Sequence, residues 1–162
     1  MPPSATATAR RSGRRVAETS DIEARVRESF ARQTIMSTIG ASIAAVRPGE
    51  VEIVLPFGDH ILQQHGFIHA GAVSTIADSA VGYAALSVMP RDAAVLTTEF
   101  KINLLSPAKG DRLRAIGRVV RAGKSLVITL GEVFAESGGS SKQVAMITAT
   151  MMVVNTGTGL KD

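Results

Sequence analysis

The sequence contains no cysteine and no tryptophan, and only 4% of its 162 residues are aromatic. The absence of cysteine excludes a disulfide framework, a thiolate zinc site and a cysteine nucleophile. No apolar run approaches the roughly 20 residues that span a bilayer, and the charged start lacks the apolar segment of a secretory signal. We therefore expect a cytoplasmic protein without a membrane partner.

Positive charge is concentrated at the start of the chain. The sequence has 18 Lys and Arg against 14 Asp and Glu, a net charge of +4. The first 20 residues contain Arg10, Arg11, Arg14 and Arg15 but only one acidic residue, Glu18. The rest of the chain therefore has a net charge close to zero. A nucleic-acid-binding protein would carry basic residues and interleaved aromatics on its folded part. We therefore expect no nucleic-acid partner.

Length and composition predict one domain between two flexible ends. Residues 1–19 are mainly Pro, Ser, Thr, Ala and Arg, which is typical of a disordered basic tail. An arginine-rich, acid-poor start also occurs in organelle transit peptides. Residues 20–156 are the expected domain, and residues 157–162 a flexible C-terminus. Ser20 to Glu23 has the form of a capping box that starts a short helix.

The hydrophobic pattern predicts an α+β domain. Residues 39–46 and 51–56 are expected to form two strands. Residues 70–87 are apolar on all sides, which is typical of a buried helix. Later the period becomes two, and strands are expected at about 96–104, 113–121, 125–135 and 143–154. In the first of these, alternation places on one face Leu96, Thr98, Phe100, Ile102 and Leu104. Such successive hairpins predict an antiparallel sheet packed against one helix.

One carboxylate interrupts the apolar helix. Asp78 is the only charged residue between positions 70 and 87. An ionised carboxylate in an apolar setting is unfavourable unless hydrogen bonds stabilise it or its pKa rises. In a structural interpretation, Asp78 accepts hydrogen bonds from Ser74, Thr75 or a neighbouring loop. In a functional one, it is a general base or nucleophile in an enclosed pocket.

The start of this helix offers a second chemical feature. Unpaired N–H groups at a helix N-terminus, with the positive end of the helix dipole, suit a developing oxyanion. Asp78 lies eight residues after Ala70, which is ~12 Å along the axis at ~1.5 Å per residue. A base and an oxyanion hole that serve one carbonyl lie within a few Å of it. If both act, they therefore come from different subunits of a two-fold dimer.

The segment HGFIHAGA at residues 65–72, followed by Ile76-Ala77-Asp78, resembles the H-G-G-x(6)-D signature of hotdog acyl-CoA thioesterases. The most similar subgroup is the phenylacetate-degradation type, related to 4-hydroxybenzoyl-CoA thioesterases. Other segments that resemble this family are residues 97–103, 106–108 and 120–125. The resemblance covers about residues 35–154. It implies a hotdog fold, an antiparallel sheet wrapped around one long central helix. It also implies a homodimer, possibly a dimer of dimers, whose sheets join edge to edge.

The resemblance further implies a composite site that hydrolyses an acyl-CoA, or a related acyl thioester, to the free acid and coenzyme A. Asp78 matches the catalytic carboxylate, as base or nucleophile, and Thr97 matches a hydroxyl that holds the water. From the facing subunit, the Ala70 N–H matches the oxyanion donor and Gln63 an orienting amide. His69 matches the motif histidine in a supporting role. Ala70 replaces the usual first glycine, and Gln63 an asparagine found in many relatives.

Coenzyme A requires cations for its phosphates. By resemblance and charge, the candidates are Lys101, Lys109, Arg121 and Lys124. Coenzyme A belongs to the substrate, so no cofactor and no metal are expected. The small residues Ala80, Val81 and Ala84 are expected to leave room for the acyl group.

Other functions compete with this prediction. A metal hydrolase would use His60, His65 and His69 with nearby acids, but the sequence has no H-E-x-x-H pattern. A hotdog enoyl-CoA hydratase or dehydratase would pair a histidine with an acid, whereas this helix offers Asp78 and no histidine. A non-catalytic acyl-CoA-binding or regulatory hotdog protein would not need the carboxylate. The presence of Asp78 together with Gln63 and Thr97 favours an enzyme.

Overall fold

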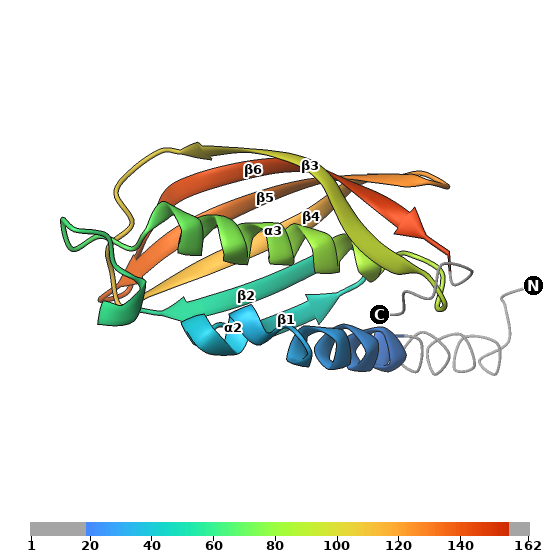
Figure 1. Cartoon of the computed structure of the whole chain (residues 1–162), viewed down its shortest axis with the longest axis horizontal. Helices are drawn as coiled ribbons and strands as arrows, with labels where there is room; N and C mark the ends of the chain where they lie inside the picture. The colour runs from blue at the N-terminus through green and yellow to red at the C-terminus, as the bar shows by residue number, and fades with distance from the viewer. Residues whose placement is uncertain (1–18, 156–162) are drawn as a thin grey trace, which may run out of the picture.

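The computed structural model describes residues 19–155 (Figure 1). The tail predicted for residues 1–19 and the C-terminus predicted for 157–162 lie outside the described residues, except that residue 19 already belongs to a helix. Residues 19–31 are the described part of this helix. Ser20 lies inside the helix and is not its N-cap, so the predicted capping box is wrong. No helix of the described part is long and apolar enough to cross a membrane.

Six strands form one antiparallel sheet in the order β1-β2-β4-β5-β6-β3. They are β1 (Ser42–Arg47), β2 (Glu50–Pro56), β3 (Ala94–Leu104), β4 (Arg112–Ala122), β5 (Leu126–Ser137) and β6 (Ser140–Val154). The sheet curves around one long helix, α3 (Ala70–Leu86), which packs against its inner face (Figure 1). The α+β architecture, the central helix and the four later strands are therefore confirmed.

The first strand starts later than the sequence pattern predicts. A short helix, α2 (Thr34–Ile39), occupies the region just before it. The helix ends at Gly40, which has a φ of 79° and donates its N–H to carbonyls of the last turn. This left-handed conformation favours glycine and is a common end of helices. Met36 is buried under α2, so burial of this side chain stabilises a helix that is too short to show a clear helical period.

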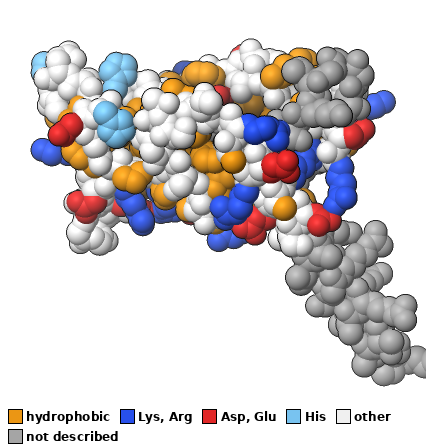
Figure 2. Space-filling model, turned by 60° about the horizontal axis from the view of Figure 1, so that its bottom comes forward, with side chains coloured by type: hydrophobic (Ala, Val, Ile, Leu, Met, Phe, Trp, Pro, Cys, Tyr) orange, Lys and Arg blue, Asp and Glu red, His pale blue; other side chains and the backbone are white. Residues whose placement is uncertain are grey.

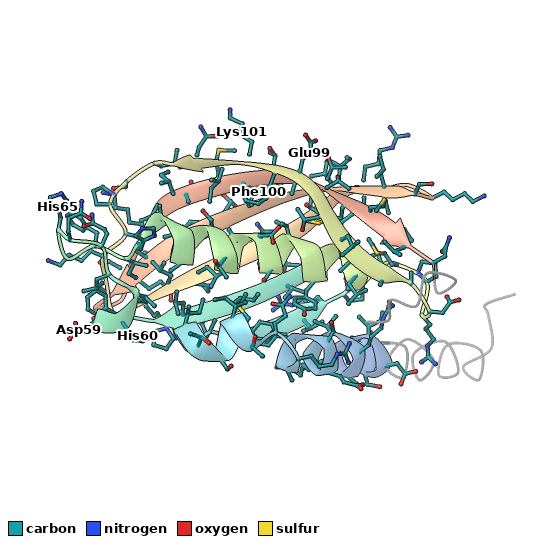
Figure 3. The ribbon with its side chains drawn as sticks, viewed as in Figure 1. Asp59, His60, His65, Glu99, Phe100 and Lys101 are labelled. Carbon is teal, nitrogen blue, oxygen red and sulfur yellow. The ribbon has the colours of Figure 1, made fainter. Side chains whose placement is uncertain are left out.

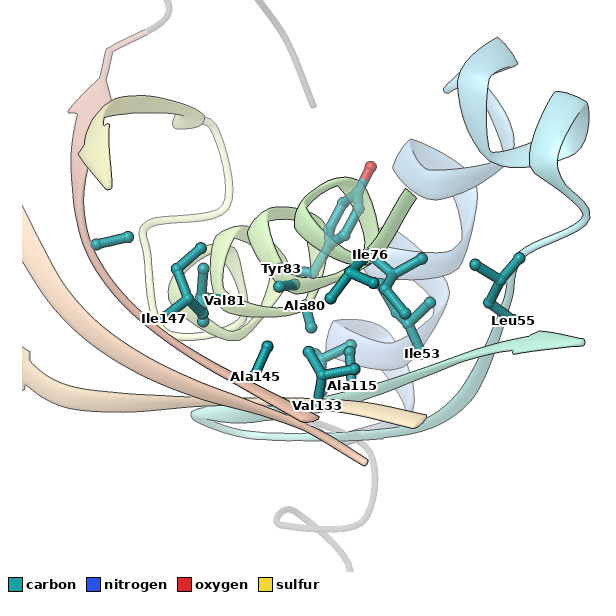
Figure 4. Packing of buried hydrophobic residues seen from close by; sticks show 14 of the residues in the cluster. Ile53, Leu55, Ile76, Ala80, Val81, Tyr83, Ala115, Val133, Ala145 and Ile147 are labelled. Atoms are coloured by element: carbon teal, nitrogen blue, oxygen red, sulfur yellow. The ribbon is translucent and has the colours of Figure 1, made fainter. Parts of the chain in front are cut away.

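The centre of α3 lies directly on the backbone of the sheet. Ile76, Ala80 and Val81 are fully buried against residues of the inner sheet face (Figure 4). At Gly117 in β4, an added Cβ would lie 2.3 Å from the backbone carbonyl atoms of Ala80. A side chain at this position would push helix and sheet apart. Gly117 therefore sets the distance of α3 from the sheet, and with it the position of Asp78.

A β-bulge in β3 changes which side chains face α3. The pairing with β6 runs through Thr97 opposite Met151 and then Glu99 opposite Thr150, so that Thr98 is the extra residue. A bulge reverses the alternation of side chains beyond it. Thr97 and Phe100, three positions apart, therefore both face α3, whereas Leu96 faces outward and is 43% exposed. The predicted common face of Leu96, Thr98 and Phe100 is wrong for this reason.

Strand β3 forms one edge of the sheet. Its apolar side chains Leu96, Phe100 and Leu104 stay 43–54% exposed in the single chain. Edge strands with an exposed apolar surface readily pair with another strand. This edge therefore combines unpaired backbone groups with exposed apolar side chains.

Candidate active site

The carboxylate of Asp78 points from α3 toward β3. Thr97 donates its hydroxyl hydrogen to Asp78 Oδ1 at 2.9 Å, and it is the only donor to Asp78 among the described residues. Ser74 and Thr75 donate instead to backbone carbonyls one turn earlier, each at 2.8 Å. The structural interpretation of Asp78 as an acceptor for these two hydroxyls is therefore wrong.

The electrostatic environment of Asp78 favours the protonated form. Burial raises the pKa of the Asp78 carboxyl, and the hydrogen bond from Thr97 opposes this effect without cancelling it. A carboxylate with a raised pKa is a stronger base than an exposed one. The environment thus suits a group that accepts a proton from water.

Asp78 lies between two cavities. The smaller one, of about 250 Å³, extends between α3, the start of β3 and the helix over residues 19–31. The larger one, of about 560 Å³, runs along α2 and β3, and Phe100 lines it. In Figure 3, Phe100 lies on the α3 side of β3, whereas Glu99 and Lys101 point away. A substrate carbonyl next to Asp78 would therefore have room on both sides.

The start of α3 carries the second group of predicted residues. His69 is the N-cap, and its Nδ1 accepts a hydrogen bond from the Gly71 N–H at 2.8 Å. The Ala70 N–H has no acceptor among the described residues. Gln63 accepts a hydrogen bond from the His65 N–H through its side chain. Gln63, His69 and Ala70 line one cavity of about 610 Å³, which Leu104 also borders. This arrangement has a free, exposed N–H group at the positive end of a long helix, as an oxyanion site requires.

The structure thus brings the predicted residues together in two groups and not in one. Asp78 and Thr97 share one cavity, and Gln63, His69 and Ala70 share another, at the opposite end of the strand β3. Ala70 and Asp78 are eight positions apart within α3, so ~12 Å of helix separates the two groups. Within a single chain, the predicted residues therefore form two separate groups.

The four predicted cations are not brought together within one chain. Lys109 follows Ala108, which lines the cavity at the start of α3. Lys101 is exposed on the outer side of β3 (Figure 3). Arg121 and Lys124 lie at the far end of β4 and in the turn after it. Of the four, Lys109 alone neighbours a cavity of the candidate site.

Several lining residues were missed from sequence. The predicted acyl-pocket residues Ala80, Val81 and Ala84 are fully buried in the core and line neither of the two cavities beside Asp78. The residues that line the smaller cavity on α3 are instead Ser79, Gly82 and Tyr83. Helical spacing from Asp78 together with the unusual glycine at 82 could have indicated this face.

The histidines do not form a metal site. Among residues 19–155, no group of three or more His, Cys, Asp or Glu side chains could hold a metal ion. His60 Nε2 lies 3.3 Å from the Ile39 carbonyl oxygen, and His65 is exposed in the loop before α3 (Figure 3). The geometry gives the metal-hydrolase alternative no support.

Many charged side chains of the folded part form ion pairs with side chains of opposite charge. Arg118 Nε lies 2.9 Å from Glu50, and Arg114 Nε lies 2.7 Å from Glu136. On the face in Figure 2, Lys and Arg side chains are interspersed with Asp and Glu. This distribution differs from the continuous basic surface that phosphate backbones require.

Comparison with known proteins assigns the family. A sequence profile of the thioesterase superfamily matches residues 65–142. The crystal structure of a thioesterase family protein from Silicibacter pomeroyi has 46% sequence identity and a TM-score of 0.81, over 83% of this chain and 98% of that chain. The chain belongs to the thioesterase superfamily. The predicted hotdog fold is confirmed with it.

Two further proteins are similar to this chain at lower sequence identity. The Escherichia coli PaaI protein, from the phenylacetic acid degradation operon, has a TM-score of 0.77 at 20% identity, over 85% of this chain and 96% of that chain. This likeness shows the fold. A Halobacterium salinarum protein with a provisional esterase name is 31% identical over 97 residues, which are 57% of this chain and 64% of the relative. Because less than two thirds of that relative is matched, the reaction has to be argued from the site itself.

Proposed function

We propose that the protein hydrolyses acyl-CoA thioesters as a homodimer, at two identical sites that each use residues of both chains. The observation that carries this proposal is the Asp78–Thr97 pair, a half-buried carboxylate with a raised pKa that opens into a cavity. Such a carboxylate in the central helix destabilises the fold, and a role as the base in hydrolysis explains why it is there. The reaction needs no cofactor, since coenzyme A enters with the substrate.

The second chain supplies the oxyanion site by pairing at β3. In an antiparallel, two-fold pairing of the β3 edges, the Thr97 end of one strand lies beside the Leu104 end of the other. Leu104 borders the cavity of Gln63, His69 and Ala70. The partner's helix start would thereby approach Asp78, and the exposed apolar side chains of β3 would become buried. This arrangement joins the two half-sites that one chain keeps ~12 Å apart.

In the proposed mechanism, the substrate carbonyl accepts a hydrogen bond from the Ala70 N–H of one chain. Asp78 of the other chain removes a proton from water, whose oxygen attacks the carbonyl carbon. Thr97 donates its own hydrogen to Asp78, so its oxygen lone pairs are free to accept from this water. The carbon–sulfur bond then breaks, and the proton passes from Asp78 to the thiolate of coenzyme A. Lys109, next to the cavity at the start of α3, is the cation we place near the phosphates.

A thiol-release assay with a panel of acyl-CoA substrates tests this function. Asp78→Asn should lower kcat by roughly two to four orders of magnitude, as expected for loss of a general base. Thr97→Val keeps the side-chain shape and removes only the hydroxyl, so it should lower kcat less than Asp78→Asn does. Lys142→Gln, an exposed change outside all cavities of the site, is the control and should retain wild-type kcat. Full activity of Asp78→Asn, or absence of thiol release from every substrate, would refute the proposal.

A further inference from the structure

The smaller cavity beside Asp78 has a polar lining. Among the described residues that form it, Val95 alone has an aliphatic side chain. In this lining, Ser29 Oγ and Tyr83 Oη lie 3.3 Å apart, and both side chains are buried. Tyr83 projects from α3 away from the residues that pack on the sheet (Figure 4). The lining of the cavity therefore includes a buried pair of hydroxyl groups.

Two further polar groups complete this lining. Ser79 donates its hydroxyl hydrogen to Gln33 Oε1 at 3.2 Å, and Arg32 borders the cavity from the turn after the neighbouring helix. A hydrocarbon chain in this space would displace water from these groups without replacing its hydrogen bonds, which is unfavourable. An acyl group with a hydroxyl near its end could replace them. The chemistry of the walls thus selects against long aliphatic chains.

Gly82 controls the width of the cavity. It lies one helical turn after Asp78 and lines the same cavity. A Cβ added at Gly82 would meet no atom within 4 Å, so the missing side chain leaves open space. Glycine inside a helix is unfavourable relative to alanine. Because glycine is unfavourable at this helical position, the open space that it leaves indicates a function for that space.

The size of the cavity indicates the size of the group that fits it. Asp78 borders this cavity of about 250 Å³ and the larger one of about 560 Å³ along β3. The two sides of a thioester differ in size, and the coenzyme requires the larger and more open path. The acyl group is then left with the smaller cavity. Since ~150 Å³ holds a benzene molecule, this cavity has room for a group of about the size of a substituted benzene ring.

We infer that this cavity binds the acyl group and selects short acyl groups that carry a hydroxyl, with Gly82 as the residue that limits size and Tyr83 and Ser29 as the residues that recognise the hydroxyl. This inference rests on the proposed thioesterase function and specifies its substrate class. It assigns Gly82, Tyr83 and Ser29 a role in specificity and none in the chemical step.

The size limit is tested with Gly82→Leu, assayed on acetyl-, butyryl-, hexanoyl- and decanoyl-CoA. Leucine is a good helix former, and the position is open, so the fold should be retained. The ratio of kcat/KM for butyryl-CoA to that for acetyl-CoA should fall at least roughly tenfold, because the added side chain fills the cavity. Thr38→Leu, on the exposed face of α2 and outside the cavities, adds a similar side chain and should leave this ratio unchanged.

Recognition of the hydroxyl is tested with Tyr83→Phe and Ser29→Ala, assayed on 3-hydroxybutyryl-CoA and butyryl-CoA. The wild type should prefer the hydroxylated substrate by about tenfold, the effect of one hydrogen bond that is left unmade in the other complex. Both variants should lose most of this preference while their kcat on butyryl-CoA changes little. A structural role alone would lower both substrates equally.

The outcomes separate this inference from the function on which it rests. Release of thiol from no substrate would overturn both. Thiol release with a preference for decanoyl-CoA, or a Gly82→Leu profile equal to that of the wild type, would overturn the size limit alone. Equal use of butyryl- and 3-hydroxybutyryl-CoA by the wild type would overturn the recognition of the hydroxyl.

Discussion

Replacing Ala70 by proline removes a single N–H group from the proposed oxyanion site. Ala70 is the first residue of α3, a position where proline is favoured because no helical hydrogen bond is lost. Its N–H has no acceptor among the described residues. The preceding residue, His69, has φ −60° and ψ 138°, which is the conformation that a following proline requires. The change should therefore leave the free energy of unfolding within about 1 kcal/mol of the wild type.

The expected effect on catalysis is large. Loss of one oxyanion donor lowers kcat by about 100- to 1,000-fold, which corresponds to about 2.7–4 kcal/mol of transition-state stabilisation. Thiol release measures kcat, and thermal unfolding checks the fold. Ala70→Ser keeps the N–H at the same place and is the matched control, expected to stay within a few fold of the wild type. Wild-type kcat in Ala70→Pro would show that this N–H is not the oxyanion donor.

The same variant tests whether each site spans two chains. Ala70→Pro lacks the donor and Asp78→Asn lacks the base, so each homodimer is inactive. In a mixed dimer, one site contains both changes and the other contains neither. Random pairing of equal amounts makes half of the dimers mixed, so the mixture should regain about a quarter of the wild-type activity. No recovery in co-expressed and purified mixed dimers would place the complete site within one chain.

Three further predictions concern stability and pH. Because the pKa of Asp78 is raised in the folded state, the protein loses stability as pH rises through this pKa. In urea unfolding, Asp78→Asn should therefore be more stable than the wild type at neutral pH, and the difference should vanish at acid pH. The kcat/KM of the wild type should rise with pH over the same range. His69→Ala should lower the free energy of unfolding by about 0.5–2 kcal/mol and should also lower kcat, because the N-cap hydrogen bond is lost. His69→Asn should restore both, since asparagine is a good N-cap. If asparagine restored stability but not kcat, the imidazole would take part in acid–base chemistry. Gly117→Ala should destabilise by about 3 kcal/mol or more, because its Cβ would meet the Ala80 backbone, whereas Gly82→Ala should not; equal unfolding midpoints would contradict the close packing of α3 on β4.

The sequence was sufficient to predict the central helix and the later strands because their hydrophobic periods are long and unbroken. It was also sufficient to single out Asp78, since one charge in seventeen helical residues is conspicuous. It was insufficient for α2, whose six residues are too few to show a period. The sequence also failed to predict the residues that line the smaller cavity beside Asp78, for a different reason. Ala80 and Gly82 are both small, and only the packing on Gly117 decides which of them faces the sheet.

The bulge in β3 lets this strand contain one residue more than β6 pairs with, while Thr97 keeps its place opposite Met151 and within reach of Asp78. If Thr98 instead paired regularly with β6, every residue before it would shift by one position, and Thr97 would turn away from the helix. Deletion of Thr98 would remove the bulge and leave Thr97 opposite Met151, still on the helix side. The contact between the carboxylate and its donor therefore tolerates a shorter strand at this point, but it does not tolerate a change in the pairing register of the residues that precede the bulge.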